Sequence, residues 1–143
     1  MERTAKAQYI IGCISLLSNK LTQFGDDFLP DLTFKQWFLL MMISKMGPDE
    51  IIVNSIADFV GTTRQNVKKM LLPLSDKGYI TMQKSKTDAR ALSIILTRKA
   101  KNYLIKNAAL TDDKTEQLFA EFSDDQLNSL VSNLRLLLQT LSE

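Results

Sequence analysis

Two short helical segments joined by a short turn that contains a glycine, near the middle of the chain, constrain the fold most. The first, NSIADFV, has Asn54 as its expected N-cap and ends at Gly61. The second, RQNVKKMLLPLSDK, follows Thr62 and Thr63, either of which is a suitable N-cap, and Gly78 predicts its end. Two short helices joined by a glycine-containing turn are typical of a helix-turn-helix.

A β-hairpin is predicted directly after the helix pair. The segment ITMQK alternates between apolar and polar residues, and LSIIL alternates again on the return, with the charged tip SKTDAR between them. The chain is therefore expected to be mainly α with a small β-hairpin wing (α+β), which is the pattern of a winged helix-turn-helix.

Pro73 lies inside the second helix of the pair. A proline removes a backbone donor and crowds the carbonyl four residues earlier, here that of Lys69, at a cost of about 3 kcal/mol. We therefore expect the helix to kink or shorten near Leu72.

Two helices are expected before the helix pair. The first runs from Thr4 to about Phe28, before Pro30, and carries an apolar stripe. Thr33 and Gln36 have capping-box spacing, which predicts a second helix. This second helix is expected to run through FLLMMIS and to stop near Gly47-Pro48, with Leu32 packing on Trp37. The stripe of the first helix comprises Ile10, Ile14, Leu17, Leu21, Phe24 and Phe28.

Two more helices are expected after the hairpin. Thr97 is a cap for a connecting helix over about 97–120, although a restart near 111–113 is an open alternative. Ser123 and Gln126 form a second capping box that starts the last helix. Its apolar stripe comprises Leu127, Leu130, Leu134, Leu137 and Leu141.

Composition excludes several kinds of chemistry. The chain has no histidine, so it has no histidine base, no Ser-His-Asp triad and no histidine-ligated metal. Its single cysteine, Cys13, excludes an internal disulfide and a cysteine-based zinc site, and fits a reducing cytoplasm. No apolar run reaches the roughly 20 residues of a membrane span, and the N-terminus is expected to be a helix and not a signal peptide. We expect no enzyme activity and no cofactor.

Charge is concentrated in one part of the chain. Residues 62–101 hold ten Lys and Arg against two Asp, so they carry a net charge of +8, while the rest carries −6. A strongly basic third in a nearly neutral protein favours a surface that faces a polyanion. Basic surfaces balanced by acidic neighbours in the fold are the alternative.

The element order, together with three segments, resembles the MarR family of winged helix-turn-helix transcriptional regulators. The segments are NSIADFVGTTRQNVKKM, LSDKGYI and DARALSIILT. The family's wing pattern, Asp-x-Arg followed after five residues by Leu-Thr, is met by Asp88, Arg90, Leu96 and Thr97. The resemblance implies one MarR-like domain over 1–143, with a winged core at about 33–97. It also implies a homodimer formed through residues 1–30 and 122–143, which would bind a pseudo-palindromic operator.

Double-stranded DNA is the expected partner. The N-terminal turns of a recognition helix reach base edges in the major groove, where Arg reads guanine and Asn or Gln reads adenine. The resemblance further implies that Arg90 enters the minor groove and that Asp88 orients it, although an incidental surface pair is the alternative for Asp88. The predicted DNA-binding residues are Thr62, Thr63, Arg64, Gln65, Asn66, Lys68, Lys69, Lys84, Lys86, Asp88 and Arg90.

Two regulatory features follow from the resemblance alone. Family members often release DNA when a small aromatic ligand binds near the dimer helices, which makes Trp37, Phe38 and Met41 a possible ligand pocket, with Met42 beside them. Packing in the core is the alternative for these side chains. Some relatives sense peroxides through a cysteine on the first helix. We expect Cys13 to be a buried structural thiol instead, because its neighbours are apolar.

The leading hypothesis is a cytoplasmic, ligand-responsive repressor. Two alternatives come from other classes: a winged-helix protein-interaction module without DNA binding, and a redox-sensing regulator that acts through Cys13.

Overall fold

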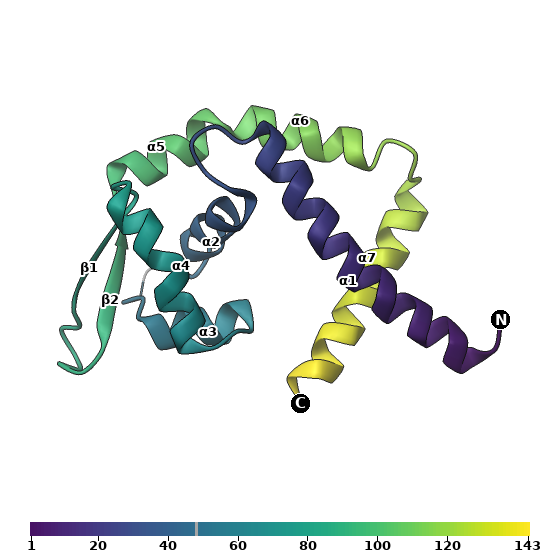
Figure 1. The fold of residues 1–143 in the computed structure, drawn as a ribbon, viewed down its shortest axis with the longest axis horizontal. Coiled ribbons are helices and arrows are strands. Elements are labelled where there is room, and N and C mark those ends of the chain that lie inside the picture. The colour runs from purple at the N-terminus through teal and green to yellow at the C-terminus, as the bar shows by residue number, and fades with distance from the viewer. Residues whose placement is uncertain (48) are drawn as a thin grey trace. The chain divides into compact units, whose positions relative to one another are not determined.

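The structure, a computed structural model, describes residues 1–47 and 49–143, which form two compact units over 1–106 and 107–143. Figure 1 shows the elements. The first unit contains α1 (Arg3–Phe28), α2 (Phe34–Ser44), α3 (Val53–Val60), α4 (Arg64–Asp76), β1 (Ile80–Lys84), β2 (Leu92–Leu96) and α5 (Arg98–Lys106). The second contains α6 (Ala108–Leu118) and α7 (Asp124–Ser142).

Helix capping follows the sequence closely. Thr33 and Gln36 form the predicted capping box of α2, and Ser123 and Gln126 form that of α7. The Thr97 hydroxyl accepts a hydrogen bond from the Ala100 amide at 3.3 Å, which confirms it as the cap of α5. Side-chain acceptors at these positions satisfy amide groups that the first helical turn leaves unpaired. Helix α2 ends at Ser44; of the predicted stop at Gly47-Pro48, Pro48 lies outside the described residues.

The start of α3 differs from the prediction. The helix begins at Val53, and its N-cap is Ile52, with no side-chain hydrogen bond. Ile52 forms an isolated antiparallel bridge with Ser93 of β2, so its backbone is already extended where the helix starts. Asn54 is consequently an exposed helical residue and not the cap.

Helix α4 passes through Pro73 and ends at Asp76, so it does not shorten near Leu72, and the kink, which is the other expected outcome, stays a prediction. Leu71 and Leu74, on either side of the proline, are fully buried and hold this turn against the core. The Lys77 amide also bonds the Pro73 carbonyl at 3.0 Å, which continues the helical pattern beyond the proline. The packing of these leucines offsets the missing backbone donor.

The predicted end of α4 is confirmed. Gly78 has φ +81°, and the Tyr79 amide bonds the Leu74 carbonyl at 2.9 Å across the turn. This left-handed turn is one that glycine adopts without strain. It sends the chain directly from the recognition helix into the hairpin.

The hairpin confirms the predicted wing. β1 and β2 pair antiparallel, from Ile80 opposite Leu96 at the base to Lys84 opposite Leu92 near the tip. Ile80 and Ile94 are buried, so the base is part of the core, while the tip extends away from the helices (Figure 1). The fold of the first unit is therefore a winged helix-turn-helix.

One core holds α2, α3, α4, the hairpin and α5 together. Its largest fully buried side chains come from α2, α3 and α4 and from the hairpin. They include Leu39, Leu40, Ile43, Ile56, Val67, Leu71, Leu74 and Ile80. Because α3 and α4 both insert side chains into this core, the helix-turn-helix is fixed as a rigid pair.

Helix α1 packs against α2 through a contact that the sequence pattern did not indicate. Gly25 is buried, and a β-carbon added there would lie 2.4 Å from Cδ2 and 2.7 Å from Cβ of Phe34. The Phe34 amide also bonds Oδ1 of Asp26 at 2.7 Å. Glycine is therefore required at position 25 by the close approach of the two helices.

The α1–α2 turn is joined to the end of α4 and to α5. Asp31 has φ +62°, and its carboxylate accepts a hydrogen bond from the Tyr79 hydroxyl. The Tyr103 hydroxyl bonds the Pro30 carbonyl at 2.7 Å. The hydrogen bond from Tyr79 is the largest cause that lowers the pKa of Asp31 from its ordinary value of 3.8.

The predicted connecting helix is divided. α5 ends at Lys106 and α6 begins at Ala108, so the break falls at Asn107 and not near 111–113. Asn107 has ψ 4°, outside helical geometry, and asparagine is a weak helix former. Within 107–143 no described side chain is buried. Among the residues that the structure describes, no helix is long and apolar enough to cross a membrane.

Candidate nucleic-acid interface

The first turns of α4 present a polar, basic surface. Thr63 is the N-cap, and its hydroxyl accepts a hydrogen bond from the Asn66 amide at 3.1 Å. Val67 points into the core and is fully buried, which directs the remaining side chains of these turns outward. The exposed residues are Thr63, Arg64, Gln65, Asn66, Lys68 and Lys69, as predicted. Thr62 is half-buried.

Asn66 is more engaged than the sequence indicated. Its side-chain nitrogen donates to the Thr62 hydroxyl at 2.9 Å and lies 3.6 Å from the Met70 sulfur. The side-chain amide of Asn66, which is expected to contact a base, is thus bound within the first turns of the helix. Arg64 and Gln65, in contrast, extend from the same turn into solvent.

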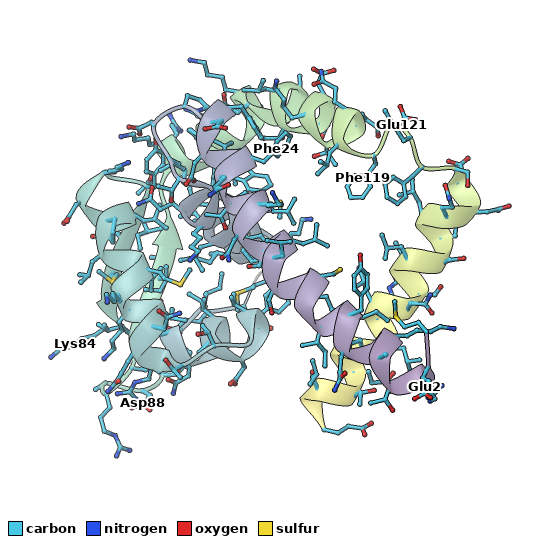
Figure 2. All side chains as sticks on the ribbon, turned by 45° about the vertical axis from the view of Figure 1, so that its right-hand side comes forward. Glu2, Phe24, Lys84, Asp88, Phe119 and Glu121 are labelled. Atoms are coloured by element: carbon cyan, nitrogen blue, oxygen red, sulfur yellow. The ribbon has the colours of Figure 1, made fainter. Side chains whose placement is uncertain are left out.

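The wing carries the other predicted residues. Lys84 and Asp88 lie at the free end of the hairpin (Figure 2), and Lys86 is exposed between them. Oδ1 of Asp88 accepts a hydrogen bond from the Arg90 amide at 3.0 Å and lies 3.6 Å from Nε of Arg90. The Arg90 side chain is 94% exposed, so this contact leaves the guanidinium open to solvent.

The fold brings the helix and the wing residues together. A cavity of about 250 Å³ lies between the start of α3, the exposed face of α4 and the wing. Arg64 and Lys68 line it from α4, and Asp88 and Arg90 line it from the wing. Three cations therefore surround one concave surface, an arrangement that attracts a polyanion.

Glu50, which precedes α3, was not predicted to belong to this region. Its carboxylate bonds the Ser85 hydroxyl at 2.9 Å, the Thr87 hydroxyl at 3.1 Å and the Lys86 amide at 3.1 Å. These partners lie 35 to 37 residues further along the chain. No local pattern indicates such a contact, because it forms only when the hairpin folds back beside the α2–α3 connection.

The predicted regulatory residues lie elsewhere in the first unit. Trp37, Phe38 and Met41 are half-buried; Trp37 packs on the core, and Phe38 stacks on Phe34 with ring centroids 6.2 Å apart. Cys13 on α1 is half-buried and not buried as expected, because the apolar side chains around it face solvent in the single chain. Its contact with Tyr9 is a hydrogen bond, which is the largest cause that raises the pKa of the Tyr9 hydroxyl.

The first unit is a winged helix-turn-helix with a basic concave surface between its recognition helix and its wing. Residues 32–92, which contain the recognition helix and the wing as far as the first residue of β2, match the model of the MarR family. This segment of the chain is therefore similar to the winged helix domain of the MarR family, as the resemblance of its motifs indicated. This family is a class of transcription regulators.

Solved structures share the fold over most of the chain. S. aureus MepR in complex with DNA is 23% identical, with a TM-score of 0.79 and coverage of 90% of this chain and 95% of that chain. A MarR transcriptional regulator from Methanosarcina mazei is 23% identical, with a TM-score of 0.80 and coverage of 93% and 96%. A Streptomyces coelicolor family member in complex with DNA is 18% identical, with a TM-score of 0.82 and coverage of 98% and 88%.

Proposed function

We propose that this protein is a sequence-specific transcriptional regulator that binds double-stranded DNA through the N-terminal turns of α4 and through Arg90 of the wing. The observation that carries the proposal is the cavity that Arg64, Lys68 and Arg90 line together. A helix face fits the major groove, and an exposed arginine suits a narrow minor groove. The DNA complexes of S. aureus MepR and of the S. coelicolor protein support this use of the fold.

Most of the predicted DNA-binding residues have a direct role in this proposal. Arg64 and Gln65 would read base edges in the major groove, and Arg90 would read the minor groove. The remaining cations would contact phosphates, which fix the position of the protein without specifying sequence. These phosphate-contacting residues are Lys68, Lys69, Lys84 and Lys86, together with the Thr62 and Thr63 hydroxyls and the amides of the helix start.

Selection of bound sites from a random pool of duplex DNA tests the proposal. A recovered consensus with two inverted half-sites, about one helical turn apart, is the expected result. Recovery of no consensus, together with binding that does not weaken as salt rises, would contradict DNA recognition. The absence of a consensus together with salt-independent binding would favour the protein-interaction module.

We also propose that the protein acts as a homodimer through α1 and α7. A unit such as 107–143, in which no described side chain is buried, lacks the apolar burial that stabilises a fold by itself. Both helices expose apolar side chains that a second copy would cover. On α1 these include Tyr9, Ile10, Ile11, Ile14 and Leu17, and on α7 they include Leu130, Val131, Leu134, Leu136, Leu138 and Leu141.

Sedimentation at micromolar concentration tests the dimer. We expect twice the protomer mass for the wild type and a shift toward the protomer for Leu134→Glu, because a charge on an apolar interface is costly to bury. Leu134 is 42% exposed in the single chain. A wild-type monomer would contradict the dimer and would favour the alternative that the stripes are covered within one chain.

A ligand-responsive repressor is the mode of action that we propose. The ligand would be a small aromatic molecule held near Trp37, Phe38 and Met41. Release of the selected duplex on titration with simple phenols, with loss of the response in Met41→Ala, would support this mode. A response that is unchanged in Met41→Ala would instead assign these side chains to the core. The packing of Trp37 on the core supports this alternative.

Redox control through Cys13 is a second candidate, since this thiol is only half-buried in the single chain and is hydrogen-bonded to the Tyr9 hydroxyl. The Cys13→Ser variant distinguishes it. Loss of DNA binding on peroxide treatment in the wild type, but not in Cys13→Ser, would establish redox control. Equal binding by both proteins after treatment would leave ligand response as the mode of regulation.

A further inference from the structure

The carboxylate of Glu50, in the α2–α3 connection, binds the residues that follow β1 in the wing. Oε2 of Glu50 accepts hydrogen bonds from the hydroxyls of Ser85 and Thr87, and Oε1 accepts one from the Lys86 amide. Three consecutive residues of the wing are therefore bound to one side chain. Ser85 is buried among them, whereas Glu50 itself is exposed.

The residues that follow Glu50 make this attachment rigid. The Ile51 carbonyl accepts a hydrogen bond from the Ile94 amide at 2.8 Å, and Ile52 bridges Ser93. Ile51 and Ile52 thus run alongside β2 like a short third strand. The backbone that follows Glu50 is thus held by β2, while its carboxylate holds the residues that follow β1.

Hydrogen bonds continue from Glu50 to the arginine of the wing. The Ser85 hydroxyl, which donates to Glu50, accepts a hydrogen bond from the Asp88 amide at 3.2 Å. Oδ1 of Asp88 accepts one from the Arg90 amide at 3.0 Å. The Asp88 carbonyl also bonds the Ala91 amide at 3.0 Å, which closes the turn. Each link fixes the backbone of the next residue in the wing.

The negative charge of Glu50, taken by itself, should weaken DNA binding. A carboxylate near a phosphate-facing surface repels the phosphates, so its removal should strengthen binding. The hydrogen bond from the Lys86 amide is the largest cause that lowers the pKa of Glu50, so the group is ionised at neutral pH. If Glu50 nevertheless favours DNA binding, its effect on the geometry of the wing must therefore outweigh this repulsion.

We propose that Glu50 is a positioning residue for DNA recognition, which holds the wing so that Arg90 reaches the minor groove in a fixed orientation. This inference rests on the proposed function. It adds that the specificity of the wing depends on an acidic side chain outside the helix-turn-helix and the hairpin. Preorganised contacts lose affinity when their supporting shell is loosened.

Binding of two duplexes by Glu50→Ala and by Asp49→Ala tests the inference. Asp49 is the neighbouring exposed acid, so its variant reports the effect of charge alone. The two duplexes are the selected site and a scrambled sequence of equal length, measured at the same salt concentration. We expect Glu50→Ala to weaken binding to the selected site by about tenfold, the size of one lost groove contact. Binding to the scrambled duplex should be unchanged or tighter, and Asp49→Ala should not weaken either.

Combination with Arg90→Ala separates positioning from a general structural role. If Glu50 acts through Arg90, Glu50→Ala should change affinity by less than about twofold in the Arg90→Ala background. Equal effects in both backgrounds would overturn the inference. Wild-type binding with no weakening in Glu50→Ala would overturn it as well, while leaving DNA recognition intact. A wild type that binds neither duplex would overturn the proposed function and this inference together.

A milder variant covers the case in which Glu50→Ala fails to fold, as judged by circular dichroism. Thr87→Val removes one hydroxyl donor to Glu50 and keeps the size and charge of the site. It should weaken binding to the selected site by about twofold to threefold and leave the scrambled duplex unaffected. Unchanged binding of both duplexes by a folded Thr87→Val would overturn the inference.

Discussion

Oδ1 of Asp88 accepts a hydrogen bond from the backbone amide of Arg90 at 3.0 Å and lies 3.6 Å from its Nε. The carboxylate therefore bonds the backbone in the turn of the wing and lies beside the start of the arginine side chain. An exposed ion pair contributes about 0–1 kcal/mol to stability, so the pair matters for geometry more than for folding. This geometry supports Asp88 as a partner of Arg90, and its role in orienting the arginine stays a prediction.

Arg90→Ala is expected to weaken binding to the selected duplex by about 1–3 kcal/mol without affecting the fold, because a groove contact is lost. Gel-shift titration and a thermal melt measure the two effects. Arg90→Lys, which keeps the charge and loses the planar fork, should fall between the wild type and Arg90→Ala. Unchanged affinity in Arg90→Ala would contradict the minor-groove role.

Asp88→Asn and Asp88→Ala separate the hydrogen bond from the charge. Asparagine keeps an oxygen that can accept from the Arg90 amide, whereas alanine removes it. We expect Asp88→Ala to weaken binding to the selected duplex more than Asp88→Asn does, as measured by gel-shift titration. If both variants bind more tightly than the wild type, repulsion by the carboxylate dominates and Asp88 does not orient Arg90.

Lys86→Ala is expected to lower affinity about equally for the selected and the scrambled duplex, because a phosphate contact carries no sequence information. The slope of log affinity against log salt should become shallower by about one unit. Fluorescence anisotropy over a salt series measures this slope. Lys35→Ala on α2, outside the proposed surface, is the matched control. A change in sequence preference would show that Lys86 contacts bases.

Gly25→Ala is expected to destabilise the protein by about 1–3 kcal/mol, because the new methyl group would overlap Phe34. Gly12→Ala on the same helix is the control, since nothing lies within 4 Å of a β-carbon added there. It should be neutral or stabilise the helix by up to about 1 kcal/mol. Urea unfolding at one fixed protein concentration compares the two. Equal effects would show that α1 does not pack on α2 at this position.

Acid titration of stability tests the contact between Asp31 and Tyr79. The hydrogen bond lowers the pKa of Asp31, so its contribution is present above the ordinary pKa of 3.8 and is lost as pH falls through the lowered value. Wild type should therefore exceed Tyr79→Phe in stability at pH 7, and this difference should shrink below about pH 4. Chemical unfolding at a series of pH values measures it. A difference that is constant with pH would assign the effect of Tyr79→Phe to packing alone.

The sequence determined the elements whose signals are local. Capping boxes at Thr33 and Ser123, and the glycine after α4, placed helix ends correctly because each depends on atoms within a few residues. The alternating strands and the Asp-x-Arg wing likewise indicated the hairpin and its family. The outward face of the recognition helix followed from the period of its apolar residues.

Only the tertiary structure decided features that depend on distant contacts. Pro73 stays helical because buried leucines on either side hold its turn, and α3 starts early because Ile52 is bridged to Ser93. Gly25 and Glu50 carried no local signal, since their partners lie elsewhere in the chain and meet them only in the folded unit. Packing and long-range hydrogen bonds overrule local preference at these places, because the free energy they contribute exceeds that of a single backbone choice.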